Sequence, residues 1–198
     1  MLELRKIEEN LKPEDIETVF QNKFITLRLV PSRWGPYVSI QSGTGKGAVL
    51  IVADTAGNEL NVLMISQPRY ALTTDAGEHN GFFTWEFPRG GHIKSESLME
   101  TAARELEEET NLKFPPQEIH YLGVAFTDSG ILNTEVDYFY ASVDTTAHPV
   151  VYNDNEILEH KWIPYSKILE AVRNGVIKDS YTMTALSKAI ISGKLPAS

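Results

Sequence analysis

The sequence predicts an α/β (α+β) fold, an α/β/α sandwich in which helices cover a mixed β-sheet behind a short N-terminal β-region. The length of 198 residues suits one domain, or one domain with a small appendage. Apolar residues make up 42% of the chain and charged residues 23%, as in an ordinary globular protein. The expected elements run as strands, one helix, further strands and two helices, and this order favours a mixed sheet packed between helices.

The chain is expected to divide into an N-terminal β lead-in over residues 1–45, a possible dimerisation region, and a main domain over residues 46–198. The first 20 residues are expected to form a short amphipathic or partly ordered segment. Apolar and β-branched residues predict a strand over residues 24–30, and a second strand over 37–40 follows a break that contains proline and glycine.

The next segments are expected to supply the buried centre of the sheet. The continuous apolar run over residues 48–53 predicts a strand that is covered on both faces. Turn-forming residues at 54–58 separate it from a strand over 61–66, which is expected to be its hairpin partner. Residues 70–84 are polar and contain glycine, and loops of this length are more often functional than idle.

The remaining elements are predicted by their periodicity and end signals. They are a short strand over 85–87, a helix over 97–110, strands over 121–125, 136–143 and near 158–163, and helices near 166–174 and 180–192. Gly175 and Gly193 follow the last two helices, where a left-handed C-terminal cap belongs.

Composition excludes several classes of site and partner. The chain has no cysteine, which rules out a disulfide framework, a thiolate metal site and a cysteine nucleophile, and fits a reducing compartment. Its net charge of -9 argues against long nucleic acids and anionic membranes as partners. No stretch reaches the ~18 apolar residues of a membrane span, and the N-terminus lacks a signal-peptide core. We therefore expect a cytoplasmic protein with no membrane partner.

The helix over 97–110 carries an unfavourable concentration of acids. Its apolar stripe faces the core, and Glu105, Glu108 and Glu109 lie together beside that stripe. Like charges at this spacing, near the negative end of the helix dipole, each cost a few tenths of a kcal/mol or more. Arg104 is one counter-charge for three carboxylates. A solvated acidic face is one interpretation; the other is a site for Mg²⁺ or Mn²⁺, which prefer carboxylate oxygens.

These acids belong to a longer pattern. Five residues separate Gly90 from Glu96, seven separate Glu96 from Arg104, and Arg-Glu-Leu-Glu-Glu-Glu-Thr-Asn-Leu then runs from Arg104 to Leu112. The pattern resembles the Nudix box, with one departure: Asn111 stands where the family has its last glycine. Asn tolerates a positive φ better than other non-glycine residues, so we expect a small cost in stability and no loss of chemistry.

The resemblance extends beyond the box. Gln67 to Arg69, Trp85 to Gly90, Glu159 to Pro164 and Lys178 to Ser180 resemble the branch of ADP-ribose and nucleoside-diphosphate-sugar pyrophosphatases. That branch commonly has a proline about fifteen residues after the box, whereas this chain has none between Pro116 and Pro149.

The resemblance implies roles for the box residues. Glu105 and Glu109 would ligate Mg²⁺, or alternatively Mn²⁺, directly; Glu108 would be a third ligand, and the backbone carbonyl of Arg89 a fourth. Arg104, counted among the catalytic residues, would pair with Glu96 to hold the helix in register. Glu96, Asn111 and Leu112 would be the structural positions of the box.

Residues outside the metal set have more open assignments. The general base is expected to be Glu135, with Asp128 as second candidate, although both can simply be loop acids. Arg69, Glu86 and Gly90 are expected to contact the substrate, but an exposed Arg69 and a structural Glu86 are alternatives. Aromatic side chains near the loop can stack on a base or pack in the core; they are Trp34, Phe82, Phe83 and Trp85.

The resemblance implies Mg²⁺-dependent hydrolysis of the diphosphate bond in a nucleoside diphosphate linked to X. ADP-ribose or another nucleotide sugar is the first expectation, with nucleoside monophosphate and sugar phosphate as products. A nucleoside triphosphate, a dinucleotide, coenzyme A or a capped RNA are alternative substrates, and a non-catalytic ligand-binding regulator is an alternative function. A homodimer is expected, with the small-molecule nucleotide as the other partner.

Overall fold

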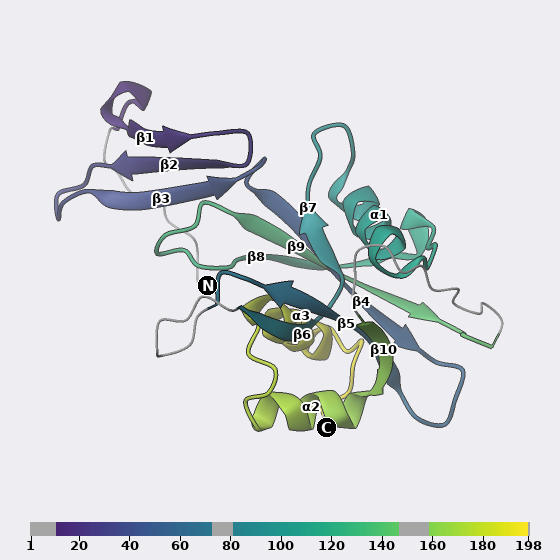
Figure 1. The fold of residues 1–198 in the computed structure, drawn as a ribbon. Helices are drawn as coiled ribbons and strands as arrows, with labels where there is room; N and C mark the ends of the chain where they lie inside the picture. Colours follow the sequence, from purple (N-terminus) through teal and green to yellow (C-terminus); the bar gives the residue numbers. More distant parts are fainter. Residues whose placement is uncertain (1–10, 73–80, 147–158, 198) are drawn as a thin grey trace.

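The computed structural model describes residues 11–72, 81–146 and 159–197. Within these residues a seven-stranded mixed sheet carries helices on both faces, and a separate three-stranded sheet lies beyond one end of it (Figure 1). The central strand order is β10-β5-β4-β9-β8, with β6 paired to β5 and β7 paired to β4. The predicted fold class is therefore confirmed.

The three-stranded sheet comes from the N-terminal part of the chain. It consists of β1 (Glu17–Gln21), β2 (Ile25–Val30) and β3 (Tyr37–Ser42), all antiparallel, after a 3₁₀ turn at Pro13–Asp15. The strands expected over 24–30 and 37–40 are present. The strand β1 lies where a lead-in was expected. All five residues of β1 are exposed, so the strand has no buried face that an alternation of apolar and polar residues could indicate. Its backbone is instead held by pairing with β2. Residues 1–10 of the lead-in lie outside the described residues.

Two strands share one edge of β4, the central strand of the main sheet. The strand β4 (Lys46–Asp54) pairs in parallel with all nine residues of β9 (Glu135–Val143). The expected hairpin partner, β5 (Asn61–Arg69), pairs with β4 at only two positions. A short strand that the sequence did not predict, β7 (Arg89–Gly91), occupies the other end of that edge of β4. The hairpin prediction was therefore correct only next to the turn.

The strand β5 also pairs with two strands other than β4. They are β6 (Phe82–Glu86) and β10 (Glu159–Pro164). The strand β6 begins three residues before the expected Trp85, so it takes up the end of the predicted loop. Of the expected features, residues 73–80 of that loop and residue 158 of the last strand lie outside the described residues.

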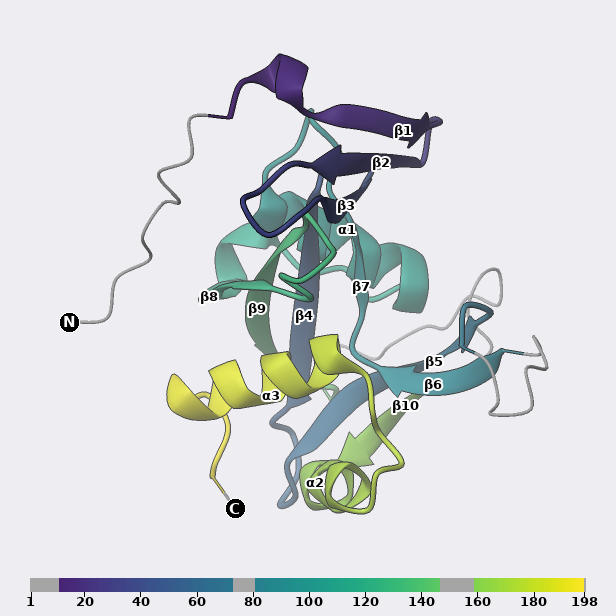
Figure 2. The same cartoon turned by 90° about the vertical axis from the view of Figure 1, so that its left-hand side faces the viewer.

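Helices cover both faces of β4 and β9 (Figure 2). The helix α1 (Leu98–Thr110) packs on one face, where Leu106 meets Leu50 and Phe139. The helix α3 (Ser180–Ile191) packs on the other, against Ile51 and Tyr138. The two clusters explain the continuous apolar run of β4, because alternate residues face opposite helices.

Three further elements belong to the main domain. They are β8 (His120–Phe126), a 3₁₀ turn at Pro116–Glu118 and α2 (Tyr165–Arg173). Gly175 and Gly193, after α2 and α3, both have φ of +68°, as their positions predict. Among the described helices, none has the length and hydropathy needed to cross a membrane.

Candidate active site

The acidic helix is held at both ends as its sequence predicts. The Ser97 hydroxyl accepts a hydrogen bond from the Glu100 N–H (3.2 Å), and the Glu100 carboxylate accepts one from the Ser97 N–H (2.6 Å). At the other end Asn111 has φ of 61° and donates its N–H to the Glu107 carbonyl (2.8 Å). Asn111 thus takes the left-handed conformation expected for the missing glycine. Leu112 next to it is buried against the same core cluster as Leu106.

Arg104 joins three carboxylates to the strand before the helix. Its guanidinium donates to Glu96 (3.1 and 2.8 Å), Glu105 (2.8 Å) and Glu108 (2.9 Å), and to the carbonyl of Gly91 (3.0 Å). The hydrogen bond from Arg104 is the main reason that the pKa of Glu96 falls to about 2. Arg104 therefore joins α1 to β7 through the Gly91 carbonyl and to the loop between them through Glu96.

Gly90 allows the carboxylate of Glu105 to lie on the backbone of β7. A Cβ atom at Gly90 would lie 1.9 Å from Cδ of Glu105, so the Glu105 carboxylate would have to move away from its present position. The neighbouring Gly91 has open space at the same position. The glycine requirement at position 90 is thus a matter of close approach, and its cause is Glu105.

Glu109 is buried without a cationic hydrogen-bond partner among the described residues. It is 9% exposed, and its carboxylate accepts hydrogen bonds from the Gln67 amide (2.6 Å) and the Arg89 backbone N–H (3.1 Å). Burial, and then the charge of Glu105, raise the pKa of Glu109 to about 8. Burial also raises the pKa of Glu105, although Arg104 opposes the rise. The two carboxylates together hold more negative charge than their surroundings compensate.

This donor set fits a hard divalent cation in its chemistry. The oxygens belong to carboxylates, and their charge is partly desolvated. In the described residues, no group of three or more His, Asp or Glu side chains has the arrangement that would hold a metal ion. Glu105 and Glu108 instead share Arg104, and Glu109 faces Gln67 and Arg89. The assignment of Glu105, Glu108, Glu109 and the Arg89 carbonyl as ligands stays a prediction.

A second charged cluster lies next to the first and is built around Glu86. This side chain is 1% exposed and accepts hydrogen bonds from Arg69 (2.8 Å), Arg89 (2.8 Å) and the Thr84 hydroxyl. Burial pushes the pKa of Glu86 upward, but the hydrogen bond from Arg69 and the charge of Arg89 outweigh it, so the pKa is lowered. Glu86 therefore anchors both arginines, and any contact of Glu86 or Arg69 with substrate stays a prediction.

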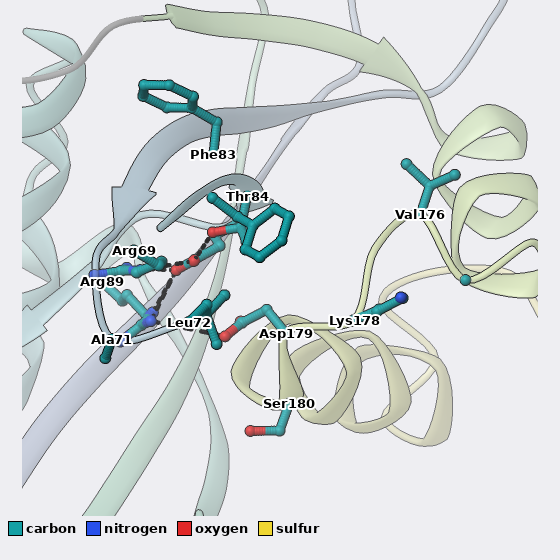
Figure 3. A pocket seen from close by; sticks show the side chains of 13 residues that line it. Arg69, Ala71, Leu72, Phe83, Thr84, Arg89, Val176, Lys178, Asp179 and Ser180 are labelled. Carbon is teal, nitrogen blue, oxygen red and sulfur yellow. Dashed lines mark hydrogen bonds and ion pairs between the residues drawn. The ribbon is translucent and has the colours of Figure 1, made fainter. Parts of the chain in front are cut away.

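The Glu86 cluster forms one end of a cavity of about 830 Å³ (Figure 3). Figure 3 shows Arg69 and Arg89 at one side and Val176 and Lys178 at the other. Phe82 and Phe83 also line the cavity and are 47% and 64% exposed. Of the four aromatic residues considered for stacking, these two line the cavity, and the Phe83 ring points away from the Glu86 cluster (Figure 3). The other two do not line it: Trp85 packs against the core and Trp34 lies in the turn before β3.

The two candidates for the general base lie at the first residue of β9 and in the loop between β8 and β9. Glu135 begins β9, where it pairs with Lys46 and Phe126, and its N–H donates to the Gly45 carbonyl (2.9 Å). Asp128 is exposed and accepts a hydrogen bond from the Gly130 N–H (3.1 Å). Neither assignment is tested by these contacts.

Three contributors to the site were not assigned from the sequence. Gln67 binds Glu109, the side chain of Arg89 binds Glu86, and Asp179 at the start of α3 lies 3.7 Å from Arg89. Gln67 and Arg69 are two residues apart on one strand, so they share a face, and that spacing was an available signal. No local signal links Asp179 to Arg89, because 90 residues separate them.

The chain is similar in sequence to known proteins. The family model described as NUDIX domain matches residues 44–185. The chain is also 33% identical over 91 residues to Nudix hydrolase 6 of Arabidopsis thaliana. That match covers 44% of this chain and 31% of the plant protein. Both matches are to proteins of the Nudix type.

Proposed function

The chain belongs to the Nudix family, and on that premise we propose that it hydrolyses the diphosphate bond of a nucleoside diphosphate linked to another group. ADP-ribose or another nucleotide sugar is the proposed substrate class, with a nucleoside monophosphate and a sugar phosphate as products. The observation that carries the proposal is the pair Glu105 and Glu109, packed on Gly90 and on the Arg89 N–H beside the cavity.

The acidic pair is proposed to hold Mg²⁺, or Mn²⁺ in its place, with Glu108 and the Arg89 carbonyl. Such an ion neutralises phosphate oxygens and favours ionisation of water. The chain's own residues prepare this site: Gln67 and the Arg89 N–H orient Glu109, while Arg104 holds Glu105 and Glu108. Of these three partners two are neutral donors and one is a cation, so the site keeps the net negative charge that attracts a divalent ion.

The cavity supports a nucleotide-sized substrate. Its volume of about 830 Å³ lies within the ~300–1,000 Å³ of small-molecule sites. Phe82 and Phe83 offer exposed aromatic surface for a base. Arg69 is half-buried at the cavity, and its guanidinium suits phosphate or ribose oxygens.

In the proposed reaction a water oxygen bonds to one phosphorus while the bond from that phosphorus to the bridging oxygen breaks. The general base takes the proton of the water, and the bridging oxygen leaves with the second phosphate. Glu135 is the first candidate for the base and Asp128 the second. A base has to reach the attacking water within hydrogen-bond distance, so each is tested by its own substitution.

We also propose a homodimer formed through the three-stranded sheet. Large apolar side chains are exposed on this sheet and its turns, and they comprise Val19, Phe20, Phe24, Ile25, Trp34, Tyr37 and Val38. Exposed apolar surface of this kind commonly marks a protein interface. Light scattering coupled to size exclusion is expected to give about twice the 22.2 kDa of one chain, and a mass of one chain would contradict the dimer.

The absence of cysteine supports a cytoplasmic location.

Product analysis on a panel tests the reaction. The purified protein with Mg²⁺ is expected to convert ADP-ribose or another nucleotide sugar to two monophosphates, and EDTA is expected to stop the conversion. Cleavage of only a nucleoside triphosphate, a dinucleotide or coenzyme A would overturn the substrate class; the absence of a proline between Pro116 and Pro149 is the observation that favours these alternatives. Tight binding without any product would instead identify a ligand-binding regulator.

A further inference from the structure

We infer that Asp179 is a positioning residue of this active site, acting through Arg89 on the carboxylates of α1. The inference rests on the proposed function. It gives a role to the Lys178 to Ser180 segment, which lies 69 residues beyond Glu109 in the chain and outside the box.

The two oxygens of Asp179 do different things. Oδ2 accepts hydrogen bonds from the Thr182 N–H (2.8 Å) and the Thr182 hydroxyl (2.9 Å), so it caps α3. Oδ1 lies 3.7 Å from the Arg89 guanidinium. Asp179 is 12% exposed in its side chain and Arg89 19%, so water screens this pair only weakly.

Two further contacts join the first turn of α3 to the same segment. The Phe87 N–H donates to the Thr182 hydroxyl (3.4 Å), and the Arg89 guanidinium lies over the Tyr181 ring, 4.1 Å from its centroid. From the opposite side the Leu50 N–H donates to the Pro88 carbonyl (3.0 Å). Residues 87–89 are thus held between α3 and β4.

This segment presents the contacts on which the acidic pair depends. The Arg89 N–H donates to Glu109, and Gly90 lies directly against the Glu105 carboxylate. A small movement of residues 87–90 would therefore disturb both proposed metal ligands at once. Displacements of about 1 Å at a catalytic group can cost on the order of 100-fold in rate.

Asp179→Asn separates positioning from helix capping. Asn is as good an N-cap as Asp, so α3 should stay capped. Because the cap needs an acceptor, the amide oxygen has to face Thr182, and the NH₂ group then faces the Arg89 guanidinium, donor against donor. Asp179→Ser also keeps the cap but leaves Arg89 without that conflict.

The matched control is Ile168→Val in α2, which removes one buried methylene from the core without touching a charged group of the site and costs about 0.5–1.5 kcal/mol. It reports what destabilisation alone does to turnover.

The experiment measures kcat and KM on the nucleotide sugar, Mn²⁺ affinity without substrate by electron paramagnetic resonance, and the melting temperature. Asp179→Asn is expected to lower kcat about tenfold and to weaken Mn²⁺ binding several-fold, with KM and melting temperature near wild type. Asp179→Ser should show a smaller loss of kcat, and Ile168→Val none.

Wild-type kcat and Mn²⁺ affinity in Asp179→Asn would overturn the inference, as would equal losses in Asp179→Asn and Ile168→Val. If the wild-type protein cleaves no phosphoanhydride, the proposed function fails, but the Mn²⁺ affinities of the same three variants still decide whether Asp179 positions the acidic pair.

Discussion

Glu86 and Glu109 are two buried carboxylates that share Arg89 in opposite ways. Glu86, 1% exposed, binds the guanidinium of Arg89 and that of Arg69, and its pKa is lowered. Among the described residues Glu109, 9% exposed, accepts hydrogen bonds from the backbone N–H of Arg89 and from the Gln67 amide, and its pKa rises to about 8. The first charge is neutralised inside the protein. The second is the charge that the proposed cation would compensate.

The comparison separates a structural charge from a functional one. A buried ion with cationic partners holds neighbouring groups in place, whereas a buried ion without them raises the free energy of the empty protein. A site that binds a cation benefits from the second kind, because the ion removes the cost when it binds.

Replacement of Glu109 should have the largest effect on activity. Glu109→Gln is expected to lower kcat by roughly 10²–10³-fold, because the amide cannot supply the negative charge at the site. Steady-state kinetics in the presence of Mg²⁺ measures this fall in kcat. Glu107→Gln on the exposed face of the same helix is the control and should retain wild-type activity. Wild-type turnover in Glu109→Gln would mean that the two carboxylates do not differ in function.

Replacement of Glu86 should have the largest effect on stability. Glu86→Gln leaves Arg69 and Arg89 without their buried anion, and the expected loss is about 3 kcal/mol in the free energy of unfolding. Urea unfolding followed by circular dichroism measures the loss. Glu170→Gln breaks an exposed ion pair with Lys167 and should change little. Equal stability in the two variants would show that Glu86 is not an anchor.

Glycine substitution tests the contact between β7 and the acidic pair. Gly90→Ala places a methyl group on the Glu105 carboxylate, so we expect kcat to fall about 10-fold or more. Gly91→Ala meets open space and is the matched control, since neither glycine has a positive φ. The measurement is kcat of both variants. Equal losses of kcat in Gly90→Ala and Gly91→Ala would point to a disturbance of the strand β7 instead of the contact with Glu105.

The raised pKa of Glu109 predicts a change of stability with pH, without a change in any contact. The folded protein binds this proton more tightly than the unfolded chain does, so without metal its stability falls as pH rises from about 5 to about 8. The expected change is roughly 3–4 kcal/mol, measured by urea unfolding in EDTA. The slope should disappear in Glu109→Gln and shrink when Mg²⁺ is added. A slope unchanged by the substitution would assign it to other groups.

Much of this arrangement was predictable from local sequence. The capping box, the apolar stripe and Asn111 place α1 within one residue, and glutamates three and four apart necessarily share one side of it. The buried run of β4 and the glycines after α2 and α3 were equally readable. These signals act within a few residues, because helix periodicity, capping and turn chemistry are short-range effects.

The tertiary structure decided which segments meet. It placed β7 on the edge of β4 where β5 was expected, and this split lets Gln67 and the Arg89 N–H reach Glu109. It gave Glu86 two arginines and brought Asp179 to Arg89 across 90 residues. Pairings between residues so far apart in the chain depend on which strand pairs with a given edge of the sheet and on how the helices pack against it. The sequence by itself determined the acidic helix, and the fold determined which of its carboxylates stays without a counter-charge.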